Sequence, residues 1–195
     1  PLYSSAASDV YKRQRELRED EILDIIQRFA TSAAICEKAG FEGVQLHGAH
    51  GYLISQFLSP LTNKRQDQWG GSIENRTRFL LQTYQAVRAA TSENFIISVK
   101  LNSADFQRGG ISEEDVIYVF KAMDAAGIDI IEVSGGSYEA PAMAGVKADK
   151  RKASTIAREA YFLDFAEKIR QEVKCHIMVT GGFRTVEGMN AALDS

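Results

Sequence analysis

The sequence predicts an α/β fold built on a parallel sheet. Four segments with helical periodicity each precede a short apolar segment typical of a buried strand. The joints at 38–44 (KAGFEGV) and 125–131 (AAGIDII) share one helix–glycine–strand pattern. A regular alternation of helices and strands is typical of parallel sheets whose neighbouring strands are joined by crossover helices.

Apolar periodicity and terminal signals give the expected helices. Ser72 is a suitable N-cap for one of them. Ser112, followed three residues later by Asp115, is typical of a capping box, and Gly127 ends the helix that begins there. The expected helices cover residues 19–38, 73–90, 113–126 and 157–173.

The expected strands cover residues 43–47 (GVQLH), 95–101 (FIISVKL), 129–133 (DIIEV) and 176–180 (HIMVT). Two architectures fit this order, an open doubly wound sheet and a (β/α)8 TIM barrel. No GxGxxG follows the first strand, which disfavours a dinucleotide-binding sheet. The long loop from Gly48 to Gly71 is of the kind that builds barrel active sites. Because a barrel needs eight strands and about 250 residues, we expect a partial TIM barrel here.

Composition narrows the class of function. The 195 residues are 45% hydrophobic and 25% charged, with a net charge of −3. A chain so near neutral offers no electrostatic footprint for nucleic acid or an anionic membrane, and no apolar stretch approaches a membrane span. Cys36 and Cys175 are far apart, so we expect both thiols to be reduced in the cytoplasm. The expected partner is a small-molecule substrate, and homo-oligomerisation is left open.

The two ends of the chain differ from the rest. Residues 1–14 (PLYSSAASDVYKRQ) have neither an apolar run nor a regular period, and SAASDVYKRQ resembles translated sequencing-adapter sequence. We expect this segment to be non-native, with a native disordered arm as the alternative, and the domain to cover residues 15–195. A new amphipathic segment begins at Thr185 and stops at Ser195, short of a typical helix.

Candidate catalytic residues follow the first strand. His47, His50 and Tyr52 lie within six residues, separated by small residues that let the backbone turn tightly. Two imidazoles can donate hydrogen bonds to one substrate oxygen, and the tyrosine can deliver a proton. The alternative is a metal-dependent hydrolase that uses HxxH as two ligands with a carboxylate such as Glu42 or Asp105 as the third. His176 begins its strand whereas His47 ends one, so His176 is not that ligand.

Two further strand ends carry candidate binding groups. Lys100 is a charged residue in an apolar strand. Burying an unpaired charge is costly, so we expect Lys100 either to have a function or to extend its ammonium into solvent. Thr180, Gly181, Gly182 and Phe183 lead into a helix, where a glycine turn can seat a phosphate. A plain turn explains the glycines equally well, and the same caution applies to the glycine pair at 135–136.

The block at 41–82 (FEGVQLHGAHGYLISQFLSPLTNKRQDQWGGSIENRTRFLLQ) resembles the signature of the old yellow enzyme family, flavin-dependent ene reductases whose relatives include 2,4-dienoyl-CoA reductase. The resemblance implies a TIM barrel that binds FMN and passes hydride from NADH or NADPH to an activated C=C bond. It implies that His47 and His50 bind the substrate carbonyl and that Tyr52 protonates the α-carbon. Lys100 would lie beside the flavin, and Gly181, Gly182 and Phe183 would line the phosphate pocket.

The sequence departs from the family pattern in two ways. Many members carry arginine where Lys100 stands, so the charge is kept but the planar fork is lost. The strands also resemble only strands four to seven of the barrel, so we expect the chain to be an internal fragment that is inactive alone. A non-catalytic phosphate-binding domain is the remaining alternative.

Overall fold

The structure is a computed structural model that describes residues 15–104, 108–136, 162–183 and 185–194. The strands are β1 (Gly43–Gly48), β2 (Ile96–Asn102), β3 (Ile130–Ser134) and β4 (His176–Val179). The helices are α2 (Glu19–Lys38), α3 (Leu53–Leu58), α4 (Ile73–Ala90), α5 (Glu113–Ala126), α7 (Leu163–Arg170) and α8 (Val186–Asp194).

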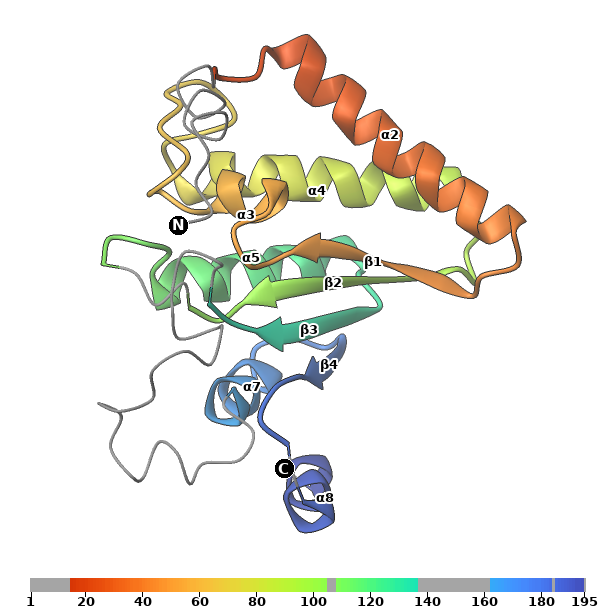
Figure 1. The fold of residues 1–195 in the computed structure, drawn as a ribbon, viewed down its shortest axis with the longest axis vertical. Helices are drawn as coiled ribbons and strands as arrows, with labels where there is room; N and C mark the ends of the chain where they lie inside the picture. The colour runs from red at the N-terminus through yellow and green to blue at the C-terminus, as the bar shows by residue number, and fades with distance from the viewer. Residues whose placement is uncertain (1–14, 105–107, 137–161, 184, 195) are drawn as a thin grey trace, which may run out of the picture.

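The strands form one parallel sheet in the order β1-β2-β3-β4 (Figure 1). Consecutive strands are therefore neighbours throughout, as in the wall of a barrel. A doubly wound sheet would reverse its strand order at a switch point. The topology confirms the prediction of a partial (β/α)8 barrel. Within the described residues, no helix combines the length and apolar content that crossing a membrane requires.

The predicted N-caps form in the middle of the chain, although the Asp115 carboxylate pairs with Arg76 where the sequence predicts the second half of a capping box. The Ser72 hydroxyl accepts a hydrogen bond from the Asn75 backbone N–H at 3.4 Å, and Ser112 does the same for Asp115 at 3.1 Å. Gly127 ends α5 with φ 90°, a conformation that costs glycine little. Local chemistry therefore sets these helix ends.

The predicted boundaries were wrong by a residue or more elsewhere. The first three strands each run one residue further than predicted, through Gly48, Asn102 and Ser134. These residues are not strand formers, but pairing with the neighbouring strand keeps them extended: Gly48 pairs with Leu101, and Asn102 pairs with Ser134.

The last helix–strand unit is shorter than predicted. Helix α7 ends at Arg170, because the chain turns there and brings Val173 into the core. The predicted beginning of that helix at 157–161 lies outside the described residues. The segment predicted from Thr185 is helical as α8, whereas residues 1–14 lie outside the described residues.

The predicted loop from Gly48 to Gly71 contains a helix that the sequence did not indicate. Helix α3 has only six residues, too few to show a period. The Phe57 ring on α3 stacks on that of Phe79 on α4, with ring centroids 4.3 Å apart. Tertiary packing, rather than local pattern, stabilises this short helix.

A buried arginine holds the rest of that loop. Arg76 on α4 is 6% exposed and donates to the carbonyl oxygens of Leu58 and Gly71. It also forms an ion pair with Asp115 on α5 at 2.6 Å. Because every one of these partners is an acceptor, the buried guanidinium is well satisfied, and the segment between α3 and α4 is anchored at both ends.

The hydrophobic core lies between the sheet and the helices. On β2 and β3, alternate side chains point to this outer face and are fully buried, among them Ile97, Val99 and Ile131. Residues on the opposite, inner face include Gln45, Lys100 and Glu132, which are polar. The polar side chains of these strands therefore lie on the inner face of the sheet.

Candidate active site

The carboxyl ends of β1, β2 and β3 lie side by side. In the strand register His47 pairs with Lys100, and Lys100 pairs with Glu132, so three polar side chains form a row across the inner face. Glycine at position 48 permits the close approach of β1 and β2 here. A Cβ on Gly48 would lie 2.9 Å from the Leu101 side chain and 3.0 Å from the Lys100 carbonyl oxygen.

The turn after β1 gathers the three residues predicted to act on substrate. His50 has φ 63° and Gly51 has φ 84°, so two successive residues are left-handed and reverse the chain. The His47 ring centroid lies 5.4 Å from that of His50 and 4.7 Å from that of Tyr52. The structure therefore brings the rings of His50 and Tyr52 next to that of His47.

The members of this cluster differ in exposure. His50 is only 8% exposed, whereas Tyr52 is 45% exposed and His47 is also open to solvent. Burial lowers the pKa of both histidines below the usual 6.5, and the neighbouring Lys100 lowers each further. Both imidazoles are therefore mainly neutral at pH 7, a state in which one ring nitrogen donates and the other accepts.

The His50 side chain is held on both ring nitrogens. Nδ1 lies 3.3 Å from the carbonyl oxygen of Gly136, and Nε2 lies 3.4 Å from the hydroxyl of Ser134. A carbonyl oxygen can only accept, so Nδ1 carries the proton in the neutral ring. The glycine pair at 135–136, which the sequence left undecided, thus contributes a carbonyl that orients His50.

Lys100 is part of a polar network that sequence reasoning missed. Its Nζ lies 2.9 Å from one carboxylate oxygen of Glu132, and Gln45 Nε2 donates to the other at 2.8 Å. Glu132 is 7% exposed, so the pair neutralises a buried charge. Lys100 keeps its charge on the inner face rather than extending away into solvent. The available signal was Glu132 itself, a carboxylate within the apolar DIIEV strand.

The predicted phosphate turn lies at the other edge of the sheet. Gly181 and Gly182 have φ 95° and 84°, which L-residues rarely adopt, and they carry the chain from β4 toward α8. Phe183 is half-buried beside them. Because β1 and β4 are the two edge strands, this turn and the His47 cluster flank the carboxyl edge rather than touch.

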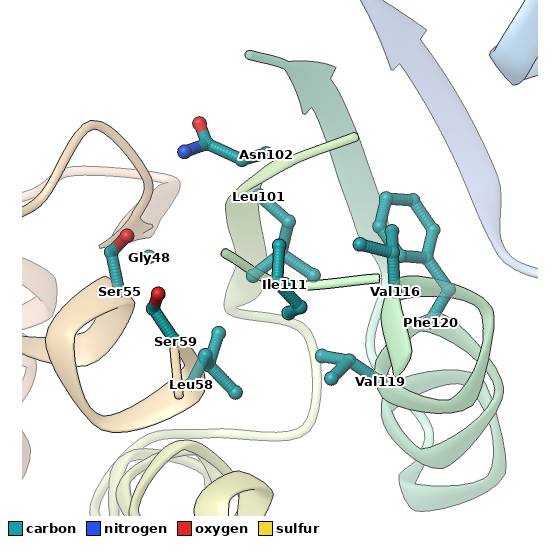
Figure 2. A pocket seen from close by; sticks show the side chains of 10 residues that line it. All are labelled: Gly48, Ser55, Leu58, Ser59, Leu101, Asn102, Ile111, Val116, Val119 and Phe120. Atoms are coloured by element: carbon teal, nitrogen blue, oxygen red, sulfur yellow. The ribbon is translucent and has the colours of Figure 1, made fainter. Parts of the chain in front are cut away.

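A small cavity lies on the helix side of the strand ends. Its lining comes from β1, β2, α3 and α5 and is mostly apolar, with Ser55, Ser59 and Asn102 as polar members (Figure 2). It has room for about one water molecule. None of His47, His50 and Tyr52 lines it, so the candidate site is the open inner face.

The described residues provide no metal site. Among them, no group of three or more His, Cys, Asp or Glu side chains is placed to hold an ion; Asp105 lies outside them. The Cys175 thiol is also a poor ligand at neutral pH, because burial and the nearby Asp124 raise its pKa to about 12.

Comparison with known families decides the class of the chain. Residues 2–194 match the NADH:flavin oxidoreductase / NADH oxidase family. The chain belongs to this family. Membership confirms the predicted resemblance to NAD(P)H-dependent flavin oxidoreductases.

Curated relatives include the NADH-dependent flavin oxidoreductase nadA of Aspergillus parasiticus, 36% identical over 97% of this chain and 42% of that protein. An NADPH dehydrogenase of Clostridium acetobutylicum is 43% identical over 64% of this chain and 37% of its own length. The chain therefore spans less than half of these flavin oxidoreductases.

Solved structures agree with the family assignment. A 2-naphthoyl-CoA reductase in complex with 2-naphthoyl-CoA superposes with a TM-score of 0.82 at 30% identity, covering 93% of this chain and 27% of that one. The old yellow enzyme homologue of Zymomonas mobilis gives a TM-score of 0.71 at 29% identity, over 92% of this chain and 47% of that one.

Proposed function

We propose that this chain forms the substrate-binding half of an FMN-dependent ene reductase, which reduces an activated C=C bond with hydride from NADH or NADPH. The observation that carries the proposal is the cluster of His47, His50 and Tyr52 at the carboxyl edge of a barrel-type sheet. Barrel enzymes place their reacting groups at this edge. An enone or enoyl compound is the substrate class that such a donor set would recognise.

Two features of the described residues fit FMN. Lys100 presents a cation on the inner face among hydrogen-bonding groups, where a flavin ring with polar edges could lie. The left-handed turn at Gly181 and Gly182 leads to the N-terminus of α8, which favours an anion. Lys100, Gly181, Gly182 and Phe183 would hold the cofactor, and bound FMN would supply the hydride.

The chain's own residues then supply orientation and the proton. His47 is exposed and free to turn a ring N–H toward a substrate carbonyl oxygen. His50 Nε2 lies on the neighbouring ring and donates to that oxygen only when the imidazole is protonated. The Tyr52 ring packs at a tilt against that of His47, and the residue is 45% exposed. A tyrosine has a reference pKa near 10, so it is protonated at neutral pH and can donate to the α-carbon.

The test separates the two half-reactions in a full-length enzyme that carries this chain. Tyr52→Phe should slow reoxidation of the reduced flavin by the alkene about 10²–10⁴-fold, the usual value of positioned acid catalysis. Flavin reduction by NAD(P)H should be nearly unchanged. Both rates are measured by stopped-flow absorbance.

Tyr118→Phe provides the matched control, because Tyr118 is a comparably exposed tyrosine on α5. It should leave both half-reactions unaltered. Equal slowing of both half-reactions by Tyr52→Phe would make Tyr52 structural, and an unchanged alkene step would assign the proton to another group.

A further inference from the structure

Asn102 connects the turn after β1, which carries His50, with the residues after β3, where Gly136 lies. Its Oδ1 accepts a hydrogen bond from the His50 backbone N–H at 3.3 Å, and its Nδ2 donates to the Gly136 carbonyl oxygen at 2.9 Å. The same Gly136 oxygen accepts from His50 Nδ1 at 3.3 Å. Asn102 at the end of β2 thus binds both the backbone of His50 and the group that holds its ring.

The amide of Asn102 can take only one orientation here. Exchanging its oxygen and nitrogen would place an NH2 against the His50 N–H and an oxygen against the Gly136 oxygen, two repulsive contacts. Asn102 and His50 are 7% and 8% exposed, so neither group can exchange its partner for bulk water at low cost. The orientation is therefore fixed by its surroundings.

His50 is a residue that needs such support. Its φ of 63° is unfavourable for any residue with a Cβ. An amide N–H in a buried turn also requires an acceptor, which Asn102 Oδ1 provides. Removing the Asn102 side chain would leave both the strained backbone and the Gly136 carbonyl less constrained.

We propose that Asn102 is a positioning residue for His50, which fixes the left-handed turn and, through the Gly136 carbonyl, the Nδ1–H tautomer of the imidazole. The consequence for binding lies at Nε2. In the neutral ring this atom carries no proton and accepts from Ser134, so it donates to a ligand oxygen only when His50 is protonated. The inference rests on the proposed function only where it assigns ligand binding to His50.

The first test reads the tautomer directly and needs no substrate. In the full-length protein labelled with ¹⁵N-histidine, the His50 ring should show a protonated Nδ1 and a bare Nε2 above its pKa. Asn102→Ala should shift the signals toward a mixture of the two tautomers. Ser103→Ala is the matched control, because the neighbouring Ser103 hydroxyl donates one hydrogen bond across the sheet to the backbone carbonyl oxygen of Ser134 at 3.0 Å, not to the Ser134 hydroxyl that contacts His50. An unchanged tautomer in a folded Asn102→Ala protein would overturn the proposal.

The second test is a double-mutant cycle on the binding of a phenolic ligand to the flavin-loaded enzyme. Asn102→Ala should weaken binding about three- to tenfold, as for one neutral hydrogen bond. In a His50→Ala background the same substitution should have almost no further effect, because its target is gone. Full additivity of the two losses would show that Asn102 does not act through His50.

A third variant guards against misfolding. Asn102→Ser is small and neutral, so it buries no charge and should fold; its hydroxyl is one bond too short to span the His50 N–H and the Gly136 carbonyl, so the tautomer preference should still be lost. If His50→Ala alone leaves ligand binding unchanged, the assigned binding role of His50 fails, and the tautomer measurement still decides whether Asn102 positions the ring.

Discussion

The outer and inner faces of the four-stranded sheet are built on different principles. The outer face meets the helices with side chains such as Ile97, Val99 and Ile131, each with no exposed area. The inner face carries Lys100 and Glu132 in a salt bridge at the same level of the sheet. Apolar burial stabilises a fold, whereas buried charges contribute little to stability even when paired.

The outer face therefore stabilises the fold, and the inner face carries the polar groups. Every other residue of a strand faces the core, so the intervening residues can be polar without disturbing that core. The buried inner charges are tolerated because they are paired, as Glu132 is with Lys100 and Gln45. Substitutions on the two faces should therefore change the free energy of unfolding by different amounts and for different reasons.

The largest expected effect lies on the outer side. Phe79 on α4 is fully buried and stacks on Phe57, so Phe79→Ala should lower the free energy of unfolding by about 3–5 kcal/mol through lost burial and a cavity. Urea unfolding followed by circular dichroism measures it. Leu23→Ala on α2 is the control, because Leu23 is 49% exposed and should change stability by less than about 0.5 kcal/mol. Equal effects of the two substitutions would contradict the packing described for this face.

An intermediate effect is expected on the inner face. Lys100→Met removes the cation beside Glu132 and leaves a buried carboxylate without its charge partner. We expect a loss of about 2 kcal/mol in unfolding free energy. Adding Glu132→Gln should restore part of that loss, because a neutral amide needs no counter-charge. A double variant no more stable than Lys100→Met alone would show that the ion pair does not carry the effect.

The smallest expected effect is a pH dependence. Burial lowers the pKa of His50 in the folded chain, so the unfolded chain binds a proton more readily. Stability from this residue is therefore complete above about pH 6.5 and is lost as the pH falls from there toward the lower folded-state pKa. Urea titrations between about pH 7.5 and 5.5 should show this decline. His50→Asn, which tolerates the left-handed turn, should reduce the decline and leave the part that His47 contributes through its own lowered pKa; an unchanged slope would assign the decline to other groups.

Local sequence chemistry predicted the elements that depend on few neighbours. The extents of α2 and α4 follow from apolar periodicity, and the ends of α5 follow from Ser112 and Gly127. The grouping of His47, His50 and Tyr52 could also be predicted, because six residues in a tight turn after a strand have little freedom to separate. Their assigned roles stay predictions.

Tertiary structure alone decided the features that join distant segments. Helix α3 depends on packing against α4, and the strands continue through Gly48, Asn102 and Ser134 because neighbouring strands pair with them. Lys100 on β2 pairs with Glu132 on β3, which also accepts from Gln45 on β1, and the carbonyl that holds His50 lies 86 positions away in the chain. No pattern within one segment encodes such contacts, since they form only when parallel strands align their carboxyl ends. The sequence thus determined which groups could act, and the sheet register decided which of them meet.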